Sequence, residues 1–140
     1  MLVALFLSCS DSTSVDSELQ AYVDDLSALG VDFSGVKVVA RDIDGINGRC
    51  SRARGFGNDT IIINLRQLKS TPVRSIHLTL LHEAVHCIGG FRGHEVSSYF
   101  NDGCKARVIS ANDPDDSASN TCWETHKLKY MEQYFEHLGG

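Results

Sequence analysis

The sequence predicts a single small α+β domain, and three observations support this fold class. First, its 140 residues suit one domain that can bury a real core. Second, short β-branched runs at residues 36–40 (VKVVA) and 60–65 (TIIINL) are typical of strands. Third, apolar residues recur at helical spacing in three segments, which predicts helices at residues 16–29, 72–88 and 123–138.

The first nine residues are expected to lie outside this domain. Residues 1–7 (MLVALFL) are almost wholly apolar and are followed by Ser8 and Cys9, as at the end of a secretory signal. The order resembles a bacterial lipobox, in which Cys9 carries the lipid; the alternative is a short buried strand. Residues 10–15 then form a linker and residues 16–140 the domain. We therefore expect an exported bacterial protein, lipid-anchored in the periplasm or at the outer membrane.

The N-terminal half is expected to supply the first helix and the sheet. The helix ends at Gly30, because glycine readily forms a left-handed C-terminal cap. After the first strand, a loop at residues 42–48 leads to a second strand at 49–54, and a turn at 55–59 precedes the third strand. The apolar stripe of the helix consists of Leu19, Tyr22, Val23, Leu26 and Leu29.

The C-terminal half is expected to contain two helices joined by a polar loop at residues 101–121. Thr71 offers a hydroxyl cap for the first of them, Pro72 fits its first turn, and two glycines stop it after residue 88. The positions expected to be buried in that helix are Val73, Ile76, Leu80, Ala84, Cys87 and Ile88. Those expected to form the apolar face of the last helix are Leu128, Met131, Phe135 and Leu138.

Charge and hydropathy argue against two kinds of partner. The net charge is −5 and basic runs are lacking, so nucleic acid is not an expected partner. The apolar runs are shorter than the ~20 residues that a membrane-spanning helix needs. Contact with a membrane is therefore expected only through a lipid at Cys9, and the protein is expected to be a monomer.

Four cysteines remain besides Cys9. An even number in a small exported domain suggests up to two disulfides, but the spacing does not choose among the three possible pairings. A zinc-finger role is weakly supported, because no two of them have the spacing of such a site. They are Cys50, Cys87, Cys104 and Cys122.

Residues 82–86 (HEAVH) have the pattern of a catalytic metal site. Residues four apart on a helix share one face, so His82 and His86 can both bind one Zn²⁺ ion. Glu83 is next to the first ligand and can act as general base on a water at the metal. The sequence therefore predicts a zinc-dependent hydrolase whose partner is a peptide or protein substrate.

The longer segment at residues 82–94 (HEAVHCIGGFRGH) resembles the zinc-binding segment of the metzincin clan, HExxHxxGxxH. The resemblance implies a zincin-like fold, with a small twisted sheet packed on the active-site helix and further helices at both ends. It also implies peptidase activity, with the substrate lying in extended form along an edge strand near residues 49–54. The matching residues are His82, Glu83, His86 and Gly89.

The third metal ligand departs from that pattern. Arg92 stands at the clan's third histidine position and cannot bind zinc, whereas His94 follows two residues later. We expect Gly90 and Gly93 to allow a slightly longer loop that delivers His94 to the metal. The alternatives for the third ligand are Glu95 and Glu124.

A closer resemblance is to small metallopeptidase-like lipoproteins of bacteria. The shared features are residues 47–50 (NGRC), the apolar strand, and a helix that ends HExxHC with a histidine nearby. This resemblance implies that Cys50 pairs with Cys87, which leaves Cys104 for Cys122. Those lipoproteins carry a Ser-Ile-Met-like segment where this chain has residues 108–110 (VIS), without methionine.

The other histidines are expected to have no role at the metal. His77 is expected at the surface or satisfied within the core, and His126 and His137 are expected to be solvated.

The alternative function is that of a catalytically degenerate or structural zinc-binding lipoprotein, which would serve as a binding module. Glu83 distinguishes the two readings, since a purely structural zinc site has no need of it.

Overall fold

The computed structural model describes residues 14–111 and 113–139. The lipobox-like segment expected at residues 1–9 lies outside the described residues, as does most of the expected linker. The end of that linker belongs to the sheet: Val15 forms a parallel bridge with Val38, whose N–H donates to the Ser14 carbonyl at 3.0 Å. The predicted α+β class is confirmed, with three strands and four α-helices in the described part.

The sheet contains β1 (Val36–Ala40), β2 (Gly48–Ser51) and β3 (Asp59–Ile63). β3 lies in the centre, parallel to β1 and antiparallel to β2. The bounds predicted for β1 are confirmed, whereas β2 is shorter than predicted. Among the strands that the structure describes, β2 pairs with β3 alone, so its other side is an open edge, which becomes important at the site.

The third predicted strand stops early, at Ile63, because Asn64 begins a helix. The side-chain oxygen of Asn64 accepts a 3.2 Å hydrogen bond from the Gln67 N–H, which is the geometry of an N-cap. Its amide nitrogen donates to the carbonyls of Ile43 and Ile46 at 2.6 and 3.0 Å. The short helix α2 (Leu65–Lys69) that follows was not predicted, because the apolar run conceals the cap.

Helix α3 (Ile76–Cys87) begins later than predicted. Its N-cap is Ser75, whose hydroxyl accepts a 3.1 Å hydrogen bond from the first turn, and not Thr71. The connection from α2 is a turn in which the Arg74 N–H donates back to a carbonyl of α2 at 2.9 Å. Val73 lies in this turn and is half exposed, so its prediction as a core residue was wrong.

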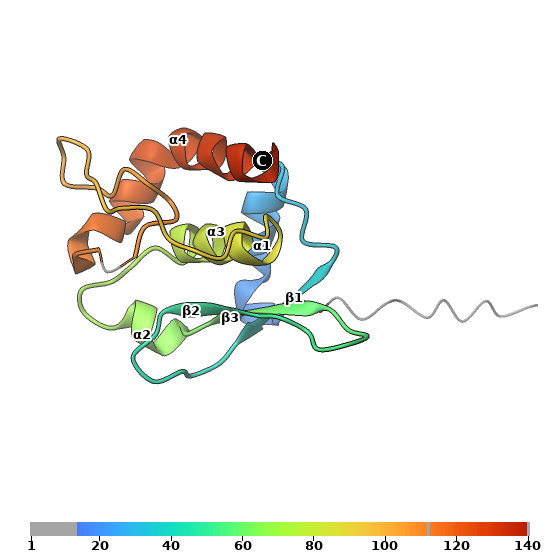
Figure 1. Ribbon diagram of the computed structural model, residues 1–140. Helices are drawn as coiled ribbons and strands as arrows, with labels where there is room; N and C mark the ends of the chain where they lie inside the picture. Colours follow the sequence, from blue (N-terminus) through green and yellow to red (C-terminus); the bar gives the residue numbers. More distant parts are fainter. Residues whose placement is uncertain (1–13, 112, 140) are drawn as a thin grey trace, which may run out of the picture.

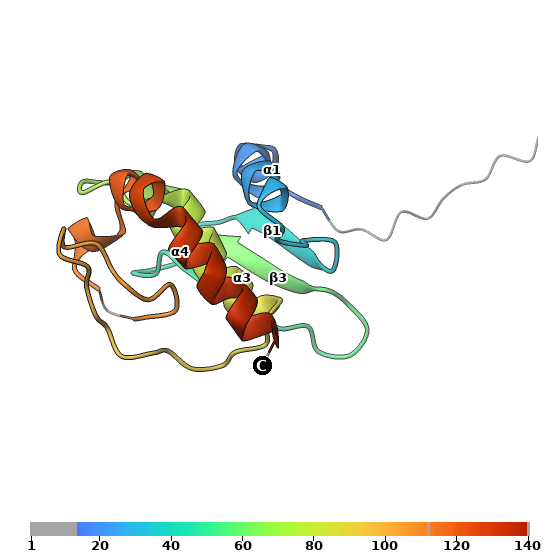
Figure 2. The same cartoon turned by 90° about the horizontal axis from the view of Figure 1, so that it is seen from above.

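The molecule has three layers (Figure 1). The sheet forms one layer, α3 and α1 (Gln20–Ala28) cover one of its faces, and α4 (Asn120–Gly139) lies on the far side of α3. Figure 2 shows α4 crossing over α3 above β3. Helix α3 is therefore covered on two sides, and its buried residues are Ile76, Leu78, Leu80, Leu81, Glu83, Ala84, Val85 and Cys87.

The apolar face predicted for α4 was largely wrong. Of the predicted residues only Met131 is buried, whereas Leu128 is 74% exposed and Phe135 and Leu138 are each 45% exposed. The buried face is aromatic and consists mainly of Trp123, Tyr130 and Tyr134. Large rings bury more apolar area than leucines, so they decide which side of α4 faces α3.

The segment between α3 and α4 is irregular but held in place. Glu95 and Ser110 form one isolated bridge and Tyr99 and Lys105 another, and a 3₁₀ turn covers Asp115–Ala118. Parts of the stretch expected as a polar loop at residues 101–121 belong to the core. Its fully buried apolar residues are Val108 and Ile109.

Two disulfides connect these elements, Cys50–Cys87 and Cys104–Cys122. The pairing that the resemblance implied is therefore confirmed. The first bond ties the edge strand β2 to the last turn of α3, and the second ties the irregular segment to the start of α4. Such bonds are consistent with an extracellular or periplasmic protein. Within the described ranges, none of the helices is long and apolar enough to cross a membrane.

Candidate metal site

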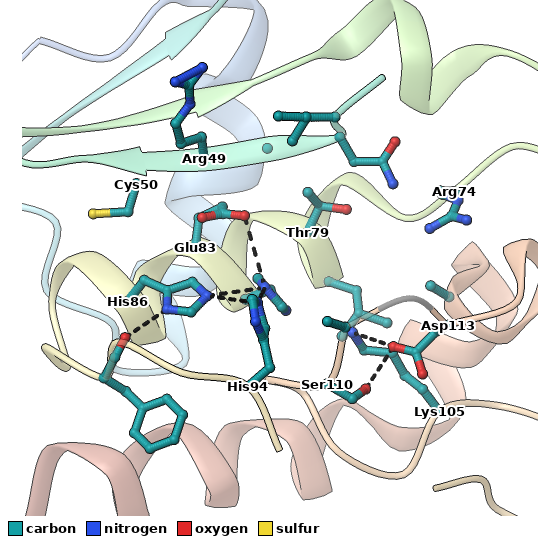
Figure 3. Close-up of a pocket in the computed structure, with 18 of the residues that line it drawn as sticks. Arg49, Cys50, Arg74, Thr79, Glu83, His86, His94, Lys105, Ser110 and Asp113 are labelled. Atoms are coloured by element: carbon teal, nitrogen blue, oxygen red, sulfur yellow. Dashed lines mark hydrogen bonds and ion pairs between the residues drawn. The ribbon is translucent and has the colours of Figure 1, made fainter. Parts of the chain in front are cut away.

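Three histidines converge beside α3, and each pair of their Nε2 atoms is 3.3 Å apart. His82 and His86 lie one turn apart on the buried helix, and His94 comes from the loop that follows it (Figure 3). The expected trio is thus brought together. Its ligand atoms form one group that can hold a metal ion.

The chain returns from α3 to the histidines through a glycine turn. Gly90 has a φ of +73°, which side-chain-bearing residues rarely adopt. A Cβ on Gly89 would lie 2.6 Å from the Val85 carbonyl oxygen, so this position also requires glycine. Gly93 shows neither constraint, so the expected role of Gly90 in delivering His94 is supported by the geometry, while that of Gly93 is not.

Backbone carbonyls orient two of the rings. His82 Nδ1 lies 2.8 Å from the Val108 carbonyl, and His86 Nδ1 lies 2.6 Å from the Phe91 carbonyl. A carbonyl only accepts, so each Nδ1 carries the proton and each Nε2 presents a lone pair to the centre. Lone pairs that face one another at this distance repel, and a bound cation removes that repulsion.

The spacing of the nitrogens fits one geometry well. With metal–nitrogen bonds of about 2.05 Å, a tetrahedral ion places neighbouring ligand nitrogens about 3.3–3.4 Å apart. The observed separations are 3.3 Å. The donor set therefore fits a tetrahedral ion with three nitrogen ligands and one remaining position.

Burial keeps two of the ligands in their metal-binding form. Desolvation lowers the pKa of His82 well below its ordinary value, and the charge of Lys105 lowers it further. Desolvation also lowers the pKa of His86. Both rings are therefore neutral at physiological pH, as metal coordination requires.

Glu83 lies beside the histidines without belonging to their group. Its residue is 6% exposed, and one carboxylate oxygen is 4.0 Å from His82 Nε2. Burial raises the pKa of Glu83 to about 7, while a hydrogen bond from the Cys50 N–H opposes this shift. Its carboxyl group can thus exchange a proton near neutral pH.

The edge strand touches Glu83 at a glycine. A Cβ on Gly48 would lie 3.0 Å from Glu83 Cγ and 3.1 Å from the methyl carbon of Thr79. These contacts are tighter than ordinary van der Waals packing, so glycine is what lets β2 approach α3 here. The NGRC motif at residues 47–50 therefore places a backbone donor and a side-chain-free position at the carboxylate.

An open cleft of about 680 Å³ surrounds the histidines and Glu83. Its walls are the β1–β2 loop and edge strand β2 on one side, and the loop after α3 and the segment around Lys105 on the other. The position left for a fourth ligand beside the three Nε2 atoms therefore opens into a cleft that can hold a short peptide segment.

Comparison of the chain with family models, curated proteins and solved structures gave no match.

The alternative third ligands are engaged elsewhere. Glu95 accepts a 2.7 Å hydrogen bond from Arg107 and lies 3.0 Å from His137 Nε2. Glu124 pairs with Lys127 at 3.1 Å on α4. Neither carboxylate belongs to the histidine group.

The expectation that the two histidines of α4 are simply solvated was wrong. His137 contacts Glu95 and packs against Phe91, with ring centroids 4.6 Å apart. His126 lies 2.6 Å from an Asp102 carboxylate oxygen and its ring stacks on a phenylalanine at 4.0 Å. The expectation that the polar atoms of His77 are satisfied is confirmed, since its ring forms a hydrogen bond with Asp25 and stacks on Trp123.

Two further groups of possible ligands include cysteines and do not offer thiolates. One contains Cys50, Asp59 and Cys87, and the other contains Asp102, Cys104 and His126. In both, the cysteines are locked in the disulfides described above. A disulfide sulfur is not the thiolate that metals bind, so neither group matches the histidine site.

The residues that sequence reasoning missed lie in the wall of the cleft. Lys105 and Asp113 form a buried ion pair at 3.6 Å, and the Ser110 hydroxyl donates to the same Asp113 oxygen at 2.6 Å. No spacing in the sequence connects Lys105 with the HEAVH motif. Only the fold of the irregular segment between α3 and α4 brings them together.

Proposed function

We propose that the chain is a zinc-dependent peptidase, in which His82, His86 and His94 hold the metal and Glu83 acts as general base. The observation that carries this proposal is the triangle of Nε2 atoms 3.3 Å apart with a buried carboxylate beside it. Three imidazoles at tetrahedral spacing favour zinc among the common metals. The open fourth position is typical of catalytic zinc sites rather than structural ones.

When bound, zinc would polarise the scissile carbonyl and lower the pKa of the attacking water. Glu83 accepts the proton of that water and returns it to the leaving amine. The raised pKa of Glu83, about 7, suits both steps, because the group then binds and releases a proton near neutral pH. The Cys50 N–H holds the carboxylate in position from the edge strand.

The open edge of β2 supports an extended peptide as substrate. Edge strands offer unpaired backbone donors and acceptors to a peptide that adds as a further strand. Residues of β2, among them Arg49 and Cys50, line the same cleft as the histidines. A peptide that pairs with β2 therefore passes close to Glu83. A metzincin-like fold belongs to this proposal, as does an exported, lipid-anchored location. The two disulfides are consistent with the extracellular or periplasmic part of this proposal.

The test measures zinc content and peptide hydrolysis on the same preparations. We expect one zinc per wild-type chain and hydrolysis of a mixed set of quenched fluorescent peptides. Glu83→Gln should keep the zinc and the fold but lose hydrolysis by a factor of about 10² or more. A Gln variant that hydrolyses as fast as the wild type would remove Glu83 from the mechanism.

The alternative, a structural or degenerate zinc site that binds a partner, gives a different pattern. It predicts zinc in both proteins, no hydrolysis in either, and little effect of Glu83→Gln on any property. A folded wild type that takes up no zinc would contradict both functions.

A further inference from the structure

The charge of the cleft is opposite to that of the chain. The sequence has 18 acidic and 13 basic residues, yet among the described residues that line the cleft five are basic and two are acidic. The two acidic residues are Glu83 and Asp113. The five basic residues are Arg49, Arg52, Arg74, Arg92 and Lys105. A concave site with one sign of charge attracts ligands of the opposite sign.

Not all of these cations face a ligand. Figure 3 shows the Arg49 side chain pointing away from α3, on the far side of β2. Arg52 donates to the His86 carbonyl at 2.6 Å and pairs with Asp59 at 3.6 Å, so it fastens β2 to α3. Of the other three, Arg92 is exposed on the loop after α3. Lys105 and Arg74 both lie at one end of the cleft, on the side away from Cys50 (Figure 3).

Lys105 is the unusual member of this pair. Its residue is 6% exposed, and its ammonium group lies in the cleft wall, 3.6 Å from Asp113. Asp113 is shared, because its oxygens also accept from the hydroxyls of Ser110 at 2.6 Å and Tyr99 at 3.3 Å. An ammonium has three donors, and the ion pair to Asp113 is longer than a good hydrogen bond. Lys105 can therefore donate to a ligand while keeping its partner.

Stability alone gives little reason for such a pair. Removing two charges from water costs about as much as their attraction returns, so a buried ion pair is weak support for a fold. The pair lies in the wall of the cleft that would hold the substrate. It is close enough to the site for the charge of Lys105 to act on both His82 and the proposed general base, Glu83. Arg74 adds a second positive charge, which acts on Lys105 in turn.

We propose that Lys105 and Arg74 form a subsite for a carboxylate of the substrate, so that the enzyme prefers acidic peptides. This inference rests on the proposed function, and it assigns the substrate class of the same site. The carboxylate is either an Asp or Glu side chain or the free C-terminus of the peptide, since both present the same two oxygens. A charge-assisted hydrogen bond in a partly desolvated wall gives a preference of about tenfold or more.

The experiment compares matched peptides on the zinc-loaded, full-length protein. Each Glu- or Asp-containing peptide is paired with its Gln or Asn counterpart, and each is made with a free and with an amidated C-terminus. We expect kcat/KM to be about tenfold higher for the peptide that carries the carboxylate, with a difference that shrinks in high salt. Amidation identifies the source: it abolishes the preference only if the C-terminus is the bound group.

The variants test whether the preference resides at Lys105. Lys105→Met and Arg74→Gln should each reduce it, and Lys129→Met, an exposed lysine on α4, is the matched control that should leave it unchanged. Because Lys105→Met leaves Asp113 buried without its cation, the double variant Lys105→Met/Asp113→Asn keeps the test available if the single variant does not fold. Equal kcat/KM for charged and neutral peptides, or a preference that survives in the folded double variant, would overturn the subsite.

A binding measurement separates this inference from the proposed function. Zinc-loaded Glu83→Gln is titrated with fluorescently labelled acidic and neutral peptides. Tighter binding of the acidic peptide, lost on adding Lys105→Met, supports the subsite even if the wild type hydrolyses nothing. Hydrolysis without any preference for acidic peptides leaves the peptidase standing and contradicts the subsite alone.

Discussion

Gly48 faces the side chain of Glu83 so closely that a Cβ at position 48 would lie 3.0 Å from Glu83 Cγ and 3.3 Å from Glu83 Oε1. An edge strand and an active-site helix meet here with no room for a side chain. Gly48 thus fixes where the proposed general base can lie relative to the metal site.

We predict that Gly48→Ala lowers peptide hydrolysis by about 10- to 100-fold, because displacing a catalytic group by a fraction of an ångström disturbs its alignment. The zinc content should not change, since the atoms nearest to a Cβ at this position belong to Glu83 and Thr79 and not to the three histidines. Gly35→Ala is the matched control, because a Cβ there meets nothing within 4 Å. Steady-state kinetics with zinc analysis checks the prediction, and equal activity of both variants would contradict it.

His94 is predicted to be the third ligand. His94→Ala should weaken zinc binding strongly, whereas Glu124→Gln should leave it unchanged, because Glu124 pairs with Lys127 and lies outside the histidine group. Loss of one ligand of a zinc site generally costs more than the 10- to 100-fold loss of affinity seen for outer-shell partners. A competition titration with a chromophoric chelator measures both. Zinc affinity that falls in Glu124→Gln and not in His94→Ala would reverse the assignment.

The start of α3 gives a test of stability. Ser75→Ala should lower the free energy of unfolding by about 1 kcal/mol, because it removes the hydroxyl that caps the helix. Thr71→Ala should change it by less than about 0.5 kcal/mol, as for most surface substitutions. Urea denaturation of the two variants decides between the caps. A larger loss of stability in Thr71→Ala than in Ser75→Ala would show that the helix begins at Thr71, as the sequence predicted.

The Cys50–Cys87 disulfide closes a sequence separation of 37 residues. The chain-entropy relation gives about 3–4 kcal/mol for a loop of this length. The double variant Cys50→Ala/Cys87→Ala should therefore unfold at a lower denaturant concentration and hold β2 less firmly over Glu83. Hydrogen exchange of the β2 amides, compared with those of β1, reports the local effect. Unchanged protection of β2 would show that packing alone holds the edge strand.

Asp102 provides a pH-dependent contribution to stability. The carboxylate accepts hydrogen bonds from the Cys104 N–H and from the His126 ring, and these lower the pKa of this carboxyl in the folded state. A lowered folded pKa means that the ionised group stabilises the fold above its unfolded pKa of about 3.9, and that this contribution disappears as the pH falls through the folded value. Asp102→Asn should therefore be less stable than the wild type near pH 6 and equal to it in strong acid.

Denaturation of both proteins across that pH range measures the difference. Asp44→Asn, a change at an exposed aspartate of the β1–β2 loop, is the control. A difference that persists below the folded pKa would assign the effect of Asp102 to something other than its charge.

Some features of this protein follow from the sequence by itself. The β-branched run at residues 36–40 has the pattern of a strand, and β1 has those bounds. His82, Glu83 and His86 share a helix, so their relative positions follow from helical geometry alone. The early end of β3 and the start of α3 could not be predicted from the sequence. The helix cap at Asn64 lies within an apolar run that is typical of a strand, and the cap at Ser75 follows Thr71 and Pro72, which are also typical of a helix start.

Other features were decided only by the tertiary structure. Which face of α4 is buried depends on the surface of α3 against which it packs. The rings of Trp123, Tyr130 and Tyr134 are buried there, whereas Leu128 and Leu138, which the periodicity predicted to be buried, are exposed. The contact between Gly48 and Glu83 and the placement of Lys105 in the cleft join segments distant in the chain. Helical and strand periodicity describe each segment separately, whereas the packing of one segment on another determines which side chains share a site.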